Sequence, residues 1–129
     1  MRNDEPFAGN GMKNFYKRPR PYQADPTLHP VCKTTDQPNS YPSGHAIVGY
    51  LEAFTLAELV PEKREAILAR ANDSAHDRLV CGVHYPSDVA ASRQVALVAF
   101  GYILGTPRFQ TELAAARVEL RKSLGLNQR

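Results

Sequence analysis

Two residues four positions apart, His84 and Asp88, have the types and spacing of a catalytic pair. Pro86 suits the first turn of a helix, so the sequence predicts a helix that opens at Pro86 or Ser87 with Asp88 in its first turn. A carboxylate there can take the Nδ1 proton of His84, which leaves Nε2 as a nucleophile of fixed tautomer. The alternative is a His–Asp pair that only ties a loop to a helix.

A second group is the run Tyr41-Pro42-Ser43-Gly44-His45, where a loop is predicted to become a helix. Ser43 can cap this helix, and Gly44 lets the backbone come close to a ligand. The free N–H groups of the first turn then point at an anion. The alternative is an ordinary helix cap followed by a surface histidine.

Three cations could bind the same anion. Arg20 and Arg78 can each present a planar fork to a phosphate, and Lys13 adds a compact positive charge. The alternative is solvated surface charge, because the chain has 16 lysines and arginines. Three other cations are interpreted as such surface charge: Lys17, Arg18 and Lys122.

Together these residues meet the needs of phosphoryl transfer. The reaction requires a nucleophile, an acid for the leaving group and positive charge on the equatorial oxygens. Two histidines, one of them oriented by an acid, supply the first two requirements. Three cations and a helix N-terminus supply the third.

Helices are predicted to position these groups. A short helix over Gly9 to Lys17 is stopped by Pro19 and Pro21, and residues 22–42 are predicted to form an irregular loop. Further helices are predicted to start at Ser43, at Pro61 and at Pro86 or Ser87, and a last one lies between a Thr106 cap and Gly125.

Apolar spacing supports these helices. Residues at steps of three and four define one buried face of the helix that follows Ser43; they are Ile47, Tyr50, Leu51, Phe54 and Ala57, widened by Leu56, Leu59 and Val60. No convincing strand or internal repeat appears. The prediction is an all-α fold in a single domain, residues 1–129.

Composition excludes several classes of function. A net charge of +3 and a pI of about 9.0 favour acidic ligands. The sequence has no stripe of basic residues interleaved with aromatic ones, so a nucleic acid polymer is not predicted as a partner. The sequence has no run of about 18 apolar residues, so no membrane span is predicted. Residues 1–6 lack the apolar segment of a signal peptide. The histidines and acids show no metal-ligand spacing, and His29 and His76 are interpreted as exposed bystanders.

The three segments resemble the signature of bacterial class A non-specific acid phosphatases, within the superfamily of type-two phosphatidic acid phosphatases and vanadium haloperoxidases. That signature reads Lys, six residues, Arg-Pro; then Pro-Ser-Gly-His; then Ser-Arg, five residues, His, three residues, Asp. The matching positions here are Lys13, Arg20-Pro21, Pro42-Ser43-Gly44-His45, Arg78, His84 and Asp88.

The resemblance implies a helical bundle that hydrolyses small phosphate monoesters without metal or other cofactor. His84 would be the nucleophile and form a phosphohistidine, Asp88 would orient it, and His45 would protonate the leaving group and later activate water. The groups implied to hold phosphate are Lys13, Arg20, Ser43, Gly44 and Arg78. A vanadium haloperoxidase and an inactive anion-binding relic are the alternatives.

The chain departs from the family pattern in two ways. Asp77 stands where the pattern has serine, and family members usually have further helices before the first motif. The resemblance also implies a periplasmic protein, for which Cys32 and Cys81 are expected to form a disulfide; two buried free thiols are the alternative. A homo-oligomer is left open.

Overall fold

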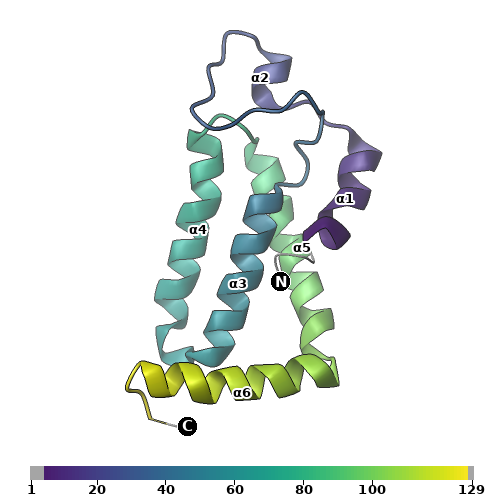
Figure 1. The fold of residues 1–129 in the computed structure, drawn as a ribbon. Coiled ribbons are helices and arrows are strands. Elements are labelled where there is room, and N and C mark those ends of the chain that lie inside the picture. The colour runs from purple at the N-terminus through teal and green to yellow at the C-terminus, as the bar shows by residue number, and fades with distance from the viewer. Residues whose placement is uncertain (1–4, 128–129) are drawn as a thin grey trace.

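The computed structural model describes residues 5–127, and the regular elements in this part of the chain are all helical (Figure 1). The predicted all-α class is therefore confirmed. In chain order the elements are α1 (Glu5–Tyr16), α2 (Pro21–Ala24), α3 (Gly44–Leu59), the 3₁₀ helix η1 (Pro61–Lys63), α4 (Arg64–Val80), α5 (Pro86–Leu104) and α6 (Pro107–Ser123).

Helices α3, α4 and α5 run alongside one another, and α6 crosses one end of them (Figure 1). α1 packs beside α3 and α5, and α2 lies with the long loop over the opposite end. The start of α3, the end of α4 and the start of α5 all meet at this loop-covered end. The three motif segments are therefore gathered at one end of the bundle.

The core lies between the long helices. Ile47 and Leu51, one helical turn apart on α3, are almost fully buried, as the spacing predicts. Aromatic rings of α3, α5 and α6 continue this core through Phe54, Phe100 and Phe109. The prediction for Leu56 was wrong: its side chain is 42% exposed, because it lies on the side of α3 away from the core.

Local signals set most helix starts. Ser43 caps α3, with its Oγ accepting from the Ala46 N–H at 3.5 Å, and Pro86 and Pro107 take the first positions of α5 and α6. Thr106 stands at the N-cap of α6, but its hydroxyl donates to the Ile103 carbonyl at 2.7 Å instead of capping.

Two boundaries differ from the prediction near the N-terminus. α1 begins at Glu5 and ends at Tyr16, earlier at both ends than predicted. Pro21 was predicted only to stop a helix, and instead it opens the short helix α2, because a proline lacks the N–H that the first helical position leaves unused anyway. The helix predicted from Pro61 begins as η1 before α4.

A disulfide joins Cys32 of the long loop to Cys81 at the end of α4, with the two Cα atoms 5.2 Å apart. This is the predicted pairing. Beside it, the Val31 N–H donates to the Cys81 carbonyl at 3.2 Å, and Gly82 adopts a φ of 72° against the backbone of Pro30. The loop is therefore tied to the turn that leads into His84.

No single helix among the described residues is long and apolar enough to cross a membrane; α5 and α6 pass that test only as a pair, and they meet at a bend of 94°.

Candidate active site

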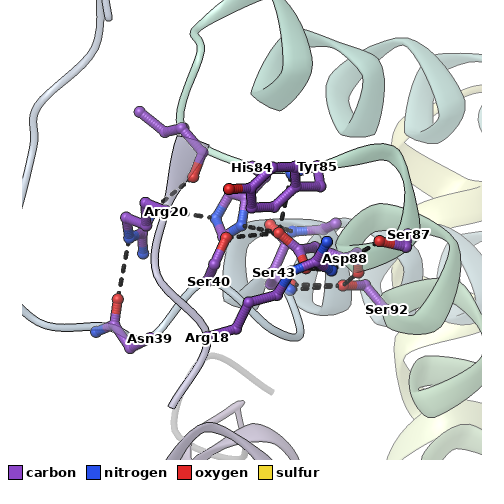
Figure 2. A network of polar contacts seen from close by, with 12 residues as sticks. Arg18, Arg20, Asn39, Ser40, Ser43, His84, Tyr85, Ser87, Asp88 and Ser92 are labelled. Atoms are coloured by element: carbon purple, nitrogen blue, oxygen red, sulfur yellow. Dashed lines mark hydrogen bonds and ion pairs between the residues drawn. The ribbon is translucent and has the colours of Figure 1, made fainter. Parts of the chain in front are cut away.

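His84 and Asp88 lie together at the start of α5 (Figure 2). Tyr85 is the N-cap of this helix, so Asp88 falls at its third position and accepts the Tyr85 N–H at 2.9 Å. The distance from His84 Nδ1 to Asp88 Oδ2 is 3.4 Å, and the two residues are 4% and 0% exposed. The pairing expected from the four-residue spacing is thus present in the structure.

The opposite ring nitrogen of His84 faces Arg20. Arg20 Nη1 lies 3.3 Å from His84 Nε2 and also donates to the Val83 carbonyl at 3.0 Å. An ionised carboxylate only accepts hydrogen bonds and a guanidinium only donates them. Both contacts of His84 are satisfied only when the proton is on Nδ1 and the lone pair is on Nε2.

The environment lowers the pKa of His84 below its ordinary value of 6.5. Burial is the largest cause, because it disfavours the charged ring, and the positive charges of Arg20 and Lys13 act in the same direction. The hydrogen bond and charge of Asp88 oppose them without cancelling them. The neutral ring, which carries the Nε2 lone pair, is therefore favoured more strongly in this site than in a free imidazole.

Asp88 is held on both carboxylate oxygens. Oδ2 accepts from Ser40 Oγ at 2.6 Å, in addition to Tyr85 and His84, while Oδ1 accepts from Arg18 Nη1 at 2.8 Å. Burial by itself raises the pKa of Asp88, but these hydrogen bonds and the Arg18 charge outweigh it and hold the pKa below its ordinary value. Asp88 is therefore ionised although it is fully buried.

Lys13 and Arg20 converge on Asn39 in the loop over the site. Lys13 Nζ donates to the Asn39 carbonyl at 3.0 Å, and Arg20 Nε donates to Asn39 Oδ1 at 3.0 Å. Asn39 thus fixes the two cations of the first motif relative to each other, next to the lone pair of His84.

Arg78 comes to the same place from the last turn of α4. Burial is the largest cause of the lowered pKa of Arg20, and Tyr22 opposes it. The positive charge of Arg78 lowers this pKa further, so the guanidinium groups of Arg20 and Arg78 are close enough to interact electrostatically. Arg78 Nε is buried and has no hydrogen-bond partner among the described residues. Because buried N–H groups are rarely left unpaired, Arg78 Nε is suited to an anionic ligand.

The Ser43-Gly44-His45 segment is joined to the His84–Asp88 segment by Ser92. The Ser43 N–H donates to Ser92 Oγ at 2.9 Å, and the Ser92 hydroxyl lies 2.7 Å from the Asp88 carbonyl and 3.0 Å from the Ser43 carbonyl. Ser43 and Ser92 are both fully buried. His45 follows in the first turn of α3 and is exposed, so this helix start presents an imidazole to solvent.

The interpretation of Arg18 as surface charge was wrong. Its guanidinium also contacts Ser87 Oγ at 2.7 Å and lies 4.1 Å above the Tyr85 ring. Its position two residues before Arg20 places it beside the first motif, but nothing local in the sequence points to Asp88 as its partner. Ser40, Asn39 and Ser92 carried no comparable signal.

Sequence reasoning gave no reason to expect metal ligands. Within residues 5–127 no three His, Cys, Asp or Glu side chains come together in an arrangement that could hold a metal ion. His29 and His76 are exposed, as expected. The side chain in contact with His84 Nε2 is the cationic Arg20.

The sequence matches known proteins over most of its length. It is 37% identical over 121 residues to a non-specific acid phosphatase of Providencia stuartii, and the matched region covers 90% of this chain and 48% of that protein. It is 36% identical over 119 residues to a non-specific acid phosphatase of Salmonella typhimurium (88% and 47%). An acid phosphatase of Zymomonas mobilis is 36% identical over 116 residues (86% and 43%).

The chain thus spans about half the length of these curated relatives. The PAP2 superfamily pattern matches residues 5–112, which include all three motif segments and the helices that carry them. With its all-helical fold and its relatives among the bacterial acid phosphatases, this chain belongs to the PAP2 superfamily.

Proposed function

We propose that this chain hydrolyses phosphate monoesters through a phosphohistidine on His84, without a metal ion. The observation that carries the proposal is the pair of contacts on the His84 ring: Nδ1 faces Asp88 and Nε2 faces Arg20. This arrangement provides a lone pair of fixed tautomer beside a cation that can hold the phosphoryl group. The similarity to proteins named acid phosphatases supports the same reaction.

The reaction has two steps. In the first, His84 Nε2 forms a bond to phosphorus while the bond from phosphorus to the leaving oxygen breaks, and that oxygen takes a proton from His45. In the second, water gives a proton to His45 and attacks phosphorus, the P–N bond breaks, and inorganic phosphate leaves. The ring gains positive charge in the first step, and the ionised carboxylate of Asp88 stabilises it.

Positive charge around the phosphoryl group replaces the role that metal ions have in other phosphoryl-transfer sites. The groups proposed to meet the phosphate oxygens are Lys13, Arg20, Arg78 and the N–H groups that follow Ser43 and Gly44. The unpaired Nε of Arg78 and its electrostatic effect on Arg20 support this proposal, because guanidinium groups form strong, charge-assisted hydrogen bonds to phosphate.

A periplasmic location is part of the proposal. The Cys32–Cys81 disulfide supports it, since such bonds persist in oxidising compartments. The similarity to bacterial acid phosphatases agrees with it.

The test is hydrolysis of a panel of phosphate monoesters, including p-nitrophenyl phosphate, with EDTA present throughout. Turnover in EDTA is expected for the wild-type chain and none for His84→Ala. Activity that is lost in EDTA and restored by a divalent cation would overturn metal independence. Bromide oxidation by the vanadate-loaded protein with peroxide, in the absence of any hydrolysis, would favour a haloperoxidase.

A further inference from the structure

Arg18 lies against the buried acid, on the side away from the cations that face His84 Nε2. Among the described residues, Asp88 Oδ1 receives its hydrogen bond from Arg18 alone, at 2.8 Å. Asp88 is fully buried, and a buried carboxylate is costly unless it is paired and hydrogen-bonded. Arg18 is the cation that provides this pairing.

Arg18 also acts on the other carboxylate oxygen through its backbone. The Arg18 carbonyl accepts the Ser40 N–H at 3.0 Å, and Ser40 Oγ donates to Asp88 Oδ2 at 2.6 Å. One residue therefore reaches both oxygens, Oδ1 through its guanidinium and Oδ2 through Ser40. The carboxylate plane that faces His84 is thereby set (Figure 2).

The guanidinium itself is held in place. It contacts Ser87 Oγ at 2.7 Å and lies over the Tyr85 ring at 4.1 Å, a cation–π arrangement. These contacts orient Arg18 towards the start of α5, whereas Arg20 is oriented towards Val83 and Asn39. The two arginines on either side of Pro19 therefore have separate partners.

We propose that Arg18 is a positioning residue that keeps Asp88 ionised and directed at His84 Nδ1, which leaves Arg20, Arg78 and Lys13 for the phosphate. This inference rests on the proposed function and adds a residue to it. A bound phosphate brings negative charge next to Asp88, and that charge favours protonation of the acid. Arg18 opposes this protonation at the stage when His84 needs an ionised partner.

Loss of the Arg18 charge should shift the acidic limb of the pH profile in one direction only. The charged groups that act on the His84–Asp88 pair are Lys13 from α1, Arg18 and Arg20 from the chain before α2, and Arg78 from α4 through its effect on Arg20. Removing one positive charge raises the proton affinity of the coupled pair, whether the first proton goes to the ring or to the carboxylate. Either protonated form of the pair is inactive, so the acidic limb of kcat/KM moves to higher pH.

The experiment compares Arg18→Gln, Arg18→Lys and Arg108→Gln. Arg108 is the matched control, because it makes a 2.9 Å ion pair with Glu112 on the exposed surface of α6. Arg18→Gln is expected to lower kcat for p-nitrophenyl phosphate about 10- to 100-fold, the effect of losing a hydrogen bond to a charged group. The inhibition constant of inorganic phosphate should change by less than about threefold, since Arg18 is not proposed to touch phosphate.

The acidic limb should move upward in Arg18→Gln, less in Arg18→Lys, and not at all in Arg108→Gln. The readout that does not need activity is NMR titration of the His84 ring nitrogens and the Asp88 carboxyl carbon, where proton uptake by the pair should begin at higher pH in Arg18→Gln. Thermal melting of each variant separates loss of the fold from loss of positioning.

If folded Arg18→Gln kept both the acidic limb of kcat/KM and the NMR titration at the wild-type position, the role of Arg18 would be overturned. The proposed function would still stand. A lysine variant shifted as far as the glutamine variant would also overturn it. A wild-type chain that hydrolyses no monoester, but whose pair titrates at higher pH in Arg18→Gln, would overturn the proposed function and keep the positioning role.

Discussion

Replacing Ser92 with alanine tests the connection between the two halves of the site. In the structure the Ser92 hydroxyl accepts the buried Ser43 N–H at 2.9 Å. In Ser92→Ala this N–H loses its partner. The Ser43 carbonyl keeps one, because it also accepts the Ile47 N–H at 3.0 Å, so the cost falls mainly on a single buried donor.

The expected loss of stability follows from this count. A buried donor left without a partner costs about 1–3 kcal/mol, and the change from serine to alanine within a helix gives back up to about 0.5 kcal/mol. The net loss is about 1.5 kcal/mol in the free energy of unfolding. For a domain of this size roughly 4 °C of melting temperature correspond to each kcal/mol, so Tm should fall by about 6 °C.

The control is Ser74→Ala, at an exposed position within α4. It makes the same change in helix propensity without removing a buried partner, and its Tm should equal that of the wild type or exceed it slightly. The measurement is thermal unfolding followed by circular dichroism, together with kcat/KM for p-nitrophenyl phosphate. We expect kcat/KM to fall in Ser92→Ala only, because Ser92 holds Ser43 in place and the N–H groups that follow Ser43 are proposed to bind phosphate.

The reasoning would be refuted if Ser92→Ala melted within about 1 °C of Ser74→Ala and kept wild-type kcat/KM. That result would mean that the Ser43 N–H is satisfied in another way and that the two halves of the site are not coupled through Ser92.

Three further predictions concern the chemistry. His84→Ala should abolish the phosphoenzyme, whereas His45→Asn should still form it from substrates with good leaving groups; acid-quench trapping with labelled substrate checks this, and an adduct that persists in His84→Ala would contradict the assignment. The profile of kcat/KM against pH should be bell-shaped, with its acidic limb below 6.5 because the pKa of His84 is lowered by burial; a flat profile from mildly acidic to mildly alkaline pH would contradict the scheme of two histidines. Orthovanadate should inhibit competitively in EDTA, and its affinity should drop at least tenfold in Arg78→Ala, since that change removes a charged fork; equal inhibition of both proteins would remove Arg78 from the phosphate site.

The sequence by itself determined the helical class and most of the helix starts. Ser43, Pro86 and Thr106 stand at or next to the starts of α3, α5 and α6 as predicted, because capping positions and the fixed φ of proline act over one or two residues. The pairing of His84 with Asp88 could be predicted for the same reason, since the two residues are four positions apart and lie on either side of a single helix start. The disulfide could be expected only through the family resemblance, which implies a periplasmic protein, because two cysteines by themselves leave two free thiols as the alternative.

Only the tertiary structure decided what surrounds this pair. Arg18 and Asp88 are 70 positions apart, and Ser40 and Asp88 are 48 apart. Their contacts depend on how the chain from Lys17 to Pro42 folds over the end of the bundle. Short-range preferences carry no information about that path, because a lone arginine or serine has the same local propensity on the surface as in a buried network. The fold alone turned Arg18 from an apparent surface charge into the partner of a buried acid.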